Sequence, residues 1–137
     1  MECIVFPTMC IFKVAAKNDG DRGCLLIAQM SSQGSLVNKS YVQSAYVQAT
    51  KHSDFVMGFI CQHRLTSDPR FLHFTPGVSI KSKGDVHGQV YNSPENAIQN
   101  GADILIVGRA ITTSDNPAKE AMAIRELAYS IYSKNSN

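Results

Sequence analysis

Short runs of consecutive apolar residues recur along the chain, within residues 23–30, 54–60, 71–75 and 103–107. Turn-forming or polar residues follow each run. Runs of this length without polar alternation indicate strands that are buried on both faces. Such strands are typical of a parallel sheet that is covered by helices or closed into a barrel. The pattern therefore predicts an α/β protein.

Helices are predicted between and after these strands. Apolar residues follow i, i+3, i+4, i+7 spacing within 40–51. The next helix has Ser93 as its N-cap, Pro94 at its first position and Gly101 as its stop. The last begins at Pro117, with the preceding asparagine as its N-cap. Alternation of strands and helices without a repeat of fixed period favours a parallel sheet.

Length and composition suit one modest domain. Hydrophobic residues make up 44% of the 137 residues, which is enough for a core. The net charge of +2, without a basic run, argues against a nucleic-acid partner. No apolar run approaches the ~20 residues of a membrane span, so no membrane partner is expected. We predict a domain over 23–134, a divergent and poorly ordered leader over 1–22, and a tail over 135–137.

The first residues do not resemble a secretory signal. Glu2 stands where a basic residue is expected, and Pro7 and Lys13 interrupt the apolar stretch. We therefore predict a cytoplasmic protein, whose cysteines stay reduced.

Cysteine and histidine spacing does not indicate a metal site. The cysteines show no C-x-x-C spacing. A zinc site could be imagined from Cys61, His63, His73 and His87, but their spacing matches no standard ligand pattern. We predict that the histidines are scattered over strands and loops, and that the protein binds no metal.

The residues that follow the predicted strands are the most informative. The carboxyl ends of parallel strands meet at one edge, where (β/α)8 barrels build their active sites and often a phosphate site. In "VGRAI", Gly108 lets the backbone approach a ligand closely, and Arg109 can bind two phosphate oxygens at once. A fifteen-residue loop, 77–91, also ends at this edge. From this motif alone, an ordinary surface arginine fits equally well.

Several motifs carry a resemblance to a known family. They are "RGCLLIAQMSSQGSL", "DFVMGFI", "FLHFTPGV", "GDVHGQVYNSP" and "GADILIVGRAI". In this order and spacing they resemble orotidine 5'-monophosphate decarboxylases, in particular the decarboxylase domain of animal uridine monophosphate synthase. The resemblance runs from about residue 22 to the C-terminus. It implies the second half of a (β/α)8 TIM barrel, strands five to eight.

The resemblance also implies a set of substrate-binding residues for orotidine or uridine monophosphate. Ser31 is similar to the serine that reads the amide edge of the pyrimidine, and Pro76 to the proline that packs near the base. The phosphate contacts implied are Gln89, Tyr91, Gly108 and Arg109. The chain departs from the common family pattern at Val90 and Ala110, where glutamine and glycine are usual. Taken alone, each motif could equally be a turn, a packing residue or simple punctuation between elements.

The catalytic group of the family is not found in the sequence. Family members convert orotidine monophosphate to uridine monophosphate and carbon dioxide without metal or cofactor. They use a Lys/Asp array whose core is Asp-x-Lys-x-x-Asp. None of the 11 acidic residues stands in that motif, and "KNDGDR" at 17–22 has the wrong order and spacing. We therefore assign no catalytic residue and expect the chain alone to be inactive.

Two other interpretations remain open. Half a barrel has two open sheet edges, so the chain could be a non-catalytic module that forms a homodimer or pairs with a complementary half. Alternatively, it could be a different phosphate-binding barrel enzyme, whose catalytic groups come from the loop 77–91. The candidates in that loop are Lys81, Lys83, Asp85 and His87.

Overall fold

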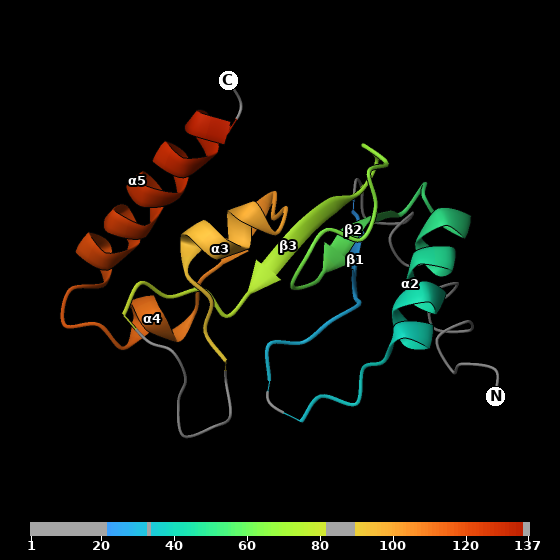
Figure 1. Ribbon diagram of the computed structural model, residues 1–137, viewed down its shortest axis with the longest axis horizontal. Coiled ribbons are helices and arrows are strands. Elements are labelled where there is room, and N and C mark those ends of the chain that lie inside the picture. Colours follow the sequence, from blue (N-terminus) through green and yellow to red (C-terminus); the bar gives the residue numbers. More distant parts are fainter. Residues whose placement is uncertain (1–21, 33, 82–89, 136–137) are drawn as a thin grey trace.

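A parallel sheet of four strands forms the centre of the molecule (Figure 1). The computed structural model describes residues 22–32, 34–81 and 90–135. The strands are β1 (Cys24–Ile27), β2 (Val56–Ile60), β3 (Leu72–Pro76) and β4 (Ile104–Ile106), and they lie side by side in chain order. All pairings are parallel, as the unbroken apolar runs predict. The predicted leader, apart from Arg22, and the last two residues lie outside the described residues.

Helices follow the strands, and two of them begin at the residues that their capping signals predict. The described helices are α2 (Lys39–Lys51), α3 (Pro94–Gln99), α4 (Arg109–Thr112) and α5 (Pro117–Asn135). The side chain of Ser93 caps α3 by accepting a hydrogen bond from the Asn96 amide at 3.1 Å. Asn116 likewise accepts from the Lys119 amide at 3.0 Å, at the start of α5. These side chains satisfy amides that have no partner within the helix, which fixes where each helix starts.

Strand register divides the sheet into two faces. Leu26 pairs with Phe59 and Phe59 with His73, so these side chains share one face. Helices α2 and α3 pack on this face, and α5 contacts α3 and α4. Phe59 is fully buried and packs near Tyr46 of α2, and a second cluster joins Leu105 to Ala97 of α3. In Figure 1, α2 lies at one end of the sheet and α3, α4 and α5 lie at the other.

The opposite face of the sheet is apolar and poorly covered. Its central row consists of Ile27, Ile60, Phe74 and Ile104, which pair with one another across all the strands. Ile27 is 51% exposed and Ile104 is 40% exposed. We call this row the inner face, because it corresponds to the interior of a barrel.

Gly58 allows β2 and β3 to approach closely. A Cβ at this position would lie 2.1 Å from the Leu72 carbonyl oxygen, which is far inside van der Waals contact. Any side chain at position 58 would therefore push the two central strands apart.

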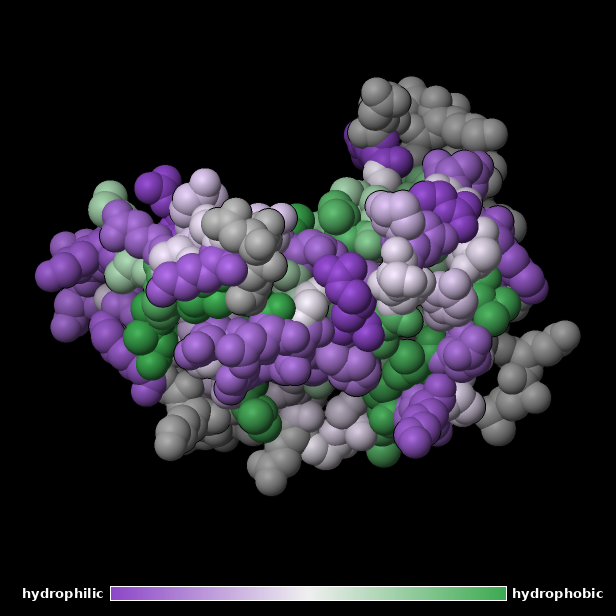
Figure 2. Space-filling model, turned by 45° about the horizontal axis from the view of Figure 1, so that its top comes forward, coloured by the Kyte–Doolittle hydropathy of each residue, from purple (hydrophilic) through white to green (hydrophobic). Residues whose placement is uncertain are grey.

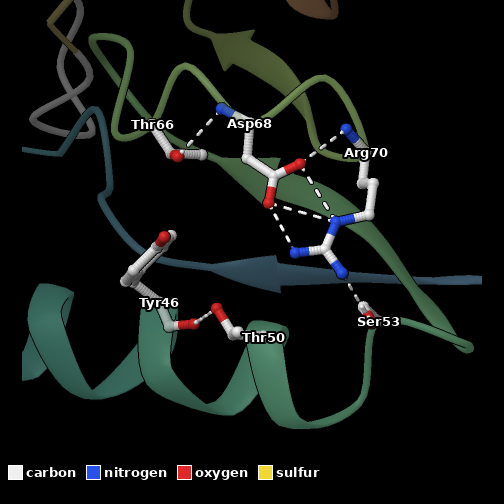
Figure 3. Close-up of polar contacts among 6 residues, drawn as sticks. All are labelled: Tyr46, Thr50, Ser53, Thr66, Asp68 and Arg70. Carbon is white, nitrogen blue, oxygen red and sulfur yellow. Dashed lines mark hydrogen bonds and ion pairs between the residues drawn. The ribbon is translucent and has the colours of Figure 1, made fainter.

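A network of side-chain hydrogen bonds orders the connection 62–70 at the amino end of β3 (Figure 3). Arg70 donates from Nη2 to Asp68 Oδ2 at 2.6 Å and from Nη1 to Ser53 Oγ at 3.3 Å. The hydrogen bonds from Arg70 lower the pKa of Asp68. Because the pair is exposed, water screens it. We assign it the role of fixing the path of the loop rather than a large stability contribution.

A second hydrogen-bond network joins the amino ends of β3 and β4. Asp103 Oδ2 accepts from the His73 backbone amide at 2.8 Å and lies 3.1 Å from His73 Nδ1, while Oδ1 accepts from Arg64 at 2.7 Å. Partial burial alone would raise the pKa of Asp103. The hydrogen bonds from His73 and Arg64 outweigh that effect, so the pKa lies below its ordinary value.

We expect Asp103→Asn to lower the free energy of unfolding by about 1–2 kcal/mol at pH 7, because charge-assisted hydrogen bonds are lost. The pKa of Asp103 is lower in the folded than in the unfolded chain. The contribution of Asp103 to the free energy of unfolding is therefore complete above its unfolded-state pKa. This contribution disappears as the pH falls through its folded-state pKa. Urea unfolding at pH 7 and pH 3 measures this, and the gap between wild type and variant should narrow at pH 3. The exposed Asp115→Asn is the control, and an equal gap at both pH values would contradict the prediction.

Candidate functional site

The predicted site residues that the structure describes follow strands at the carboxyl edge of the sheet. Ser31 lies shortly after β1, Pro76 ends β3, and Gly108 and Arg109 follow β4. Pairing of Pro76 with Ile106 places the ends of β3 and β4 next to each other. The shared edge predicted from the strand order is thus observed. Gln89 lies outside the described residues.

Backbone hydrogen bonds bring the loops of this edge together. The Val90 amide donates to the Ser31 carbonyl at 2.8 Å, and the Asn92 amide donates to the Gly77 carbonyl at 2.7 Å. Tyr91, which is half-buried, lies between these two anchored residues. The segment that carries Tyr91 is therefore tied both to the loop of Ser31 and to the exit of β3 beside Pro76. These residues are far apart in sequence, and no local pattern predicts the bonds that join them.

The turn after β4 has room for a ligand beside its backbone. Apart from Gly108 and its two chain neighbours, no described residue has an atom within 4 Å of the position that a Cβ on Gly108 would occupy. The helix that follows, α4, contains only four residues, so its dipole is weak. The Arg109 guanidinium, on an exposed side chain, is then the main positive group that the described part of this turn offers to an anion.

Lys81 is held by an acidic residue at the same end of the sheet. Its Nζ lies 2.5 Å from Oε2 of Glu120, a residue of α5 that is 8% exposed. The pair borders a polar cavity of about 220 Å³ beside Ala110 and Ser79. Lys81 therefore forms an ion pair with Glu120 within the fold. Lys83, Asp85 and His87, the other candidates of the alternative enzyme interpretation, lie outside the described residues.

Two glutamines near Pro76 were not singled out by sequence reasoning. Gln62 donates from Nε2 to the Pro76 carbonyl at 3.3 Å, and the Gln62 amide donates to Gln29 Oε1 at 2.9 Å. Both glutamines follow strands, as Ser31 does. That position was the available signal, but Gln29 lies within the apolar run 23–30 and Gln62 lies among the polar residues that follow the run 54–60.

Thiol and metal chemistry find little support in the described part of the chain. Burial raises the pKa of Cys61 to about 11, and the nearby Asp103 charge adds to this effect, so the thiol stays protonated at neutral pH. Residues 22–32, 34–81 and 90–135 contain no group of three or more His, Cys, Asp or Glu side chains arranged to hold a metal ion. Within the same ranges, no helix is long and apolar enough to cross a membrane.

Comparison with known proteins identifies the family. The family model described as "Orotidine 5'-phosphate decarboxylase / HUMPS family" matches residues 4–124. The chain belongs to this family. The resemblance read from the motifs is therefore confirmed, and the observed edge is the carboxyl edge of an orotidine 5'-phosphate decarboxylase family fold.

Relatives of known name agree with the family. The chain is 46% identical over 112 residues to uridine 5'-monophosphate synthase of Bos taurus, covering 81% of this chain and 23% of that protein. It is 42% identical over 127 residues to orotidine 5'-phosphate decarboxylase of Hypocrea jecorina, covering 82% of this chain and 33% of that protein. The chain thus spans a third or less of the length of these two relatives.

A solved structure agrees with the fold. The orotidine 5'-monophosphate decarboxylase from Sulfolobus solfataricus superposes with a TM-score of 0.58 at 22% identity, covering 79% of this chain and 49% of that chain. The described sheet therefore corresponds to about half of a decarboxylase TIM barrel. The predicted fold class, a partial barrel of four parallel strands, is confirmed.

Proposed function

We propose that this chain supplies the base- and phosphate-binding half of an orotidine 5'-monophosphate decarboxylase site. Its ligand is then orotidine or uridine 5'-monophosphate, bound without metal or cofactor. The observation that carries the proposal is the pair of backbone bonds that fix Tyr91 between Ser31 and Gly77 at 2.8 and 2.7 Å. They gather residues for the base and for the phosphate at the edge that Arg109 also joins.

The residue types suit such a ligand. Ser31 and Tyr91 carry hydroxyl groups that donate neutral hydrogen bonds, and the Arg109 guanidinium supplies a fork that matches phosphate oxygens. Pro76 offers an apolar ring edge for packing against a pyrimidine. We assign Gln89 to the phosphate group by the family resemblance, together with Gly108. Reduced cysteines fit a cytoplasmic location, which we retain as part of the proposal.

The decarboxylation step is assigned to residues other than those described. The sequence contains no Asp-x-Lys-x-x-Asp motif, which the resemblance places after the third strand of a complete barrel. We therefore propose that these 137 residues bind the nucleotide but do not decarboxylate it by themselves. Binding of the phosphate, far from the reacting carbon, would then serve to assemble the complete site.

A second candidate function is pairing with a complementary half-barrel. The exposed apolar inner face favours it, as do the outer edges of β1 and β4, which pair with no further strand among the described residues. Figure 2 shows hydrophobic patches exposed among hydrophilic residues, on the side of α3 and α5 and also toward α2. The occupant we propose is a polypeptide segment with the first four strands of the barrel, whether in the same longer chain or in a separate one.

Thermal unfolding with and without ligand tests nucleotide binding. A ligand that binds only the folded chain stabilises it by about 2.7 kcal/mol at a concentration of 100 Kd, so uridine 5'-monophosphate should raise the Tm by several degrees. Ribose 5-phosphate should give a smaller shift, and uridine without phosphate should give almost none. A cooperative transition with the same Tm at every concentration of uridine 5'-monophosphate would contradict the proposal.

A further inference from the structure

Two glutamine side chains continue the sheet's hydrogen bonding past the ends of the strands. The last backbone bonds here run from Gln29 to the Ile60 carbonyl at 3.0 Å and from Cys61 to the Phe74 carbonyl at 3.0 Å. Beyond them, the Gln62 amide is satisfied by the Gln29 side chain rather than by a backbone carbonyl. The Gln62 side chain in turn bonds the Pro76 carbonyl.

Chemistry fixes the orientation of both side-chain amides. The Gln62 backbone N–H can only donate, so the Gln29 atom that faces it at 2.9 Å is the carbonyl Oε1. Gln29 Nε2 must then donate, and its partner at 3.3 Å, His63 Nε2, must accept. The Pro76 carbonyl can only accept, so Gln62 presents Nε2 to it. Neither amide can be flipped without placing two donors or two acceptors face to face.

This bridge links Pro76 to the chain that follows β2. Proline has no N–H, so its carbonyl is the backbone polar group through which this residue can be held. Pro76 pairs with Ile106 of β4 on one side, but on the other side β2 ends at Ile60, so backbone pairing with β2 no longer reaches position 76. Gln62 spans that gap from a half-buried position.

We propose that Gln62 is a positioning residue for the pyrimidine base, and that Gln29 orients Gln62. This inference rests on the proposed nucleotide site, in which Pro76 packs against the base. Gln62 does not touch the ligand's phosphate in this scheme. It holds the wall against which the base packs, while Arg109 and Tyr91 bind the phosphate through other loops. The bridge therefore contributes to affinity for the base and not to affinity for phosphate.

The test compares two ligands that share a phosphate. Isothermal titration of the full chain with uridine 5'-monophosphate and with ribose 5-phosphate separates the share of the affinity that depends on the base. Gln62→Met keeps the length of the side chain and removes its donor. We expect it to weaken nucleotide binding about tenfold, the size of one unsatisfied polar contact, and to leave ribose 5-phosphate binding unchanged. Gln29→Met should show the same pattern with a smaller effect.

Gln99→Met, on an exposed position of α3, is the matched control and should change neither affinity. If Gln62→Met weakens both ligands equally, or neither of them, the positioning role is wrong while the nucleotide site stands. If the wild-type chain binds neither ligand, the proposed function fails, and this inference is overturned with it.

Discussion

Arg109→Ala is expected to weaken uridine 5'-monophosphate binding by about 10- to 100-fold, which corresponds to the 1.5–3 kcal/mol of a hydrogen-bonded charge. Arg109 follows β4 at the edge where the Tyr91 segment is anchored, and α4 is too short to provide a strong dipole. In the proposed site, the guanidinium is therefore expected to supply most of the favourable charge for the phosphate. Isothermal titration at low and physiological salt measures the loss.

Two further variants make this prediction specific. Arg109→Lys keeps a positive charge but loses the planar fork, so it should lose less affinity than Arg109→Ala. Arg125→Ala removes an exposed arginine from α5 and should leave affinity within about twofold of wild type, as surface substitutions usually do. The difference in uridine 5'-monophosphate affinity between wild type and Arg109→Ala should also decrease as the salt concentration rises. Equal affinity of Arg109→Ala and Arg125→Ala would exclude the phosphate role.

The fold could be predicted from sequence wherever local chemistry decides it. Ser93 and Pro94 define the start of α3, and the unbroken apolar run ending at Ile60 defines a buried parallel strand. In these places the cap, the period and the turn all favour the same structure. Local consistency of this kind is what makes a sequence readable.

The contacts between loops could not be predicted in the same way. Some hydrogen bonds join residues that are distant in sequence, such as those of Val90 with Ser31 and of His73 with Asp103. Each depends on strand order and register, which place the partners together only after the sheet forms. The contact made by Gln62 could not be predicted from the residues around it, because it depends on Pro76, a residue of the neighbouring strand. The family resemblance supplied site residues, but not the side chains that support them.

Co-expression with a complementary half-barrel should produce a soluble complex with decarboxylase activity, whereas this chain alone should show none. The partner would be the segment with the first four barrel strands of a similar protein, such as the orotidine 5'-phosphate decarboxylase of Hypocrea jecorina. The expected effect is large because the complex would unite the nucleotide site with the Lys/Asp array. It would also pair the outer edges of β1 and β4 and bury the inner face. Co-purification on a tag and a decarboxylation assay of the complex measure the two parts of this prediction.

Matched variants locate the interface. Ile104→Lys places a charge on the inner face at the edge strand β4, where the partner would bury it, and should abolish co-purification. Val47→Lys changes a residue of α2 with nearly the same exposure, 38% against 40% for Ile104, and should leave the complex intact. If the two halves never co-purify, or if both lysine variants behave alike, the inner face is not the pairing surface. A complex that forms without activity would instead support the pairing and contradict the predicted decarboxylase activity of the complex.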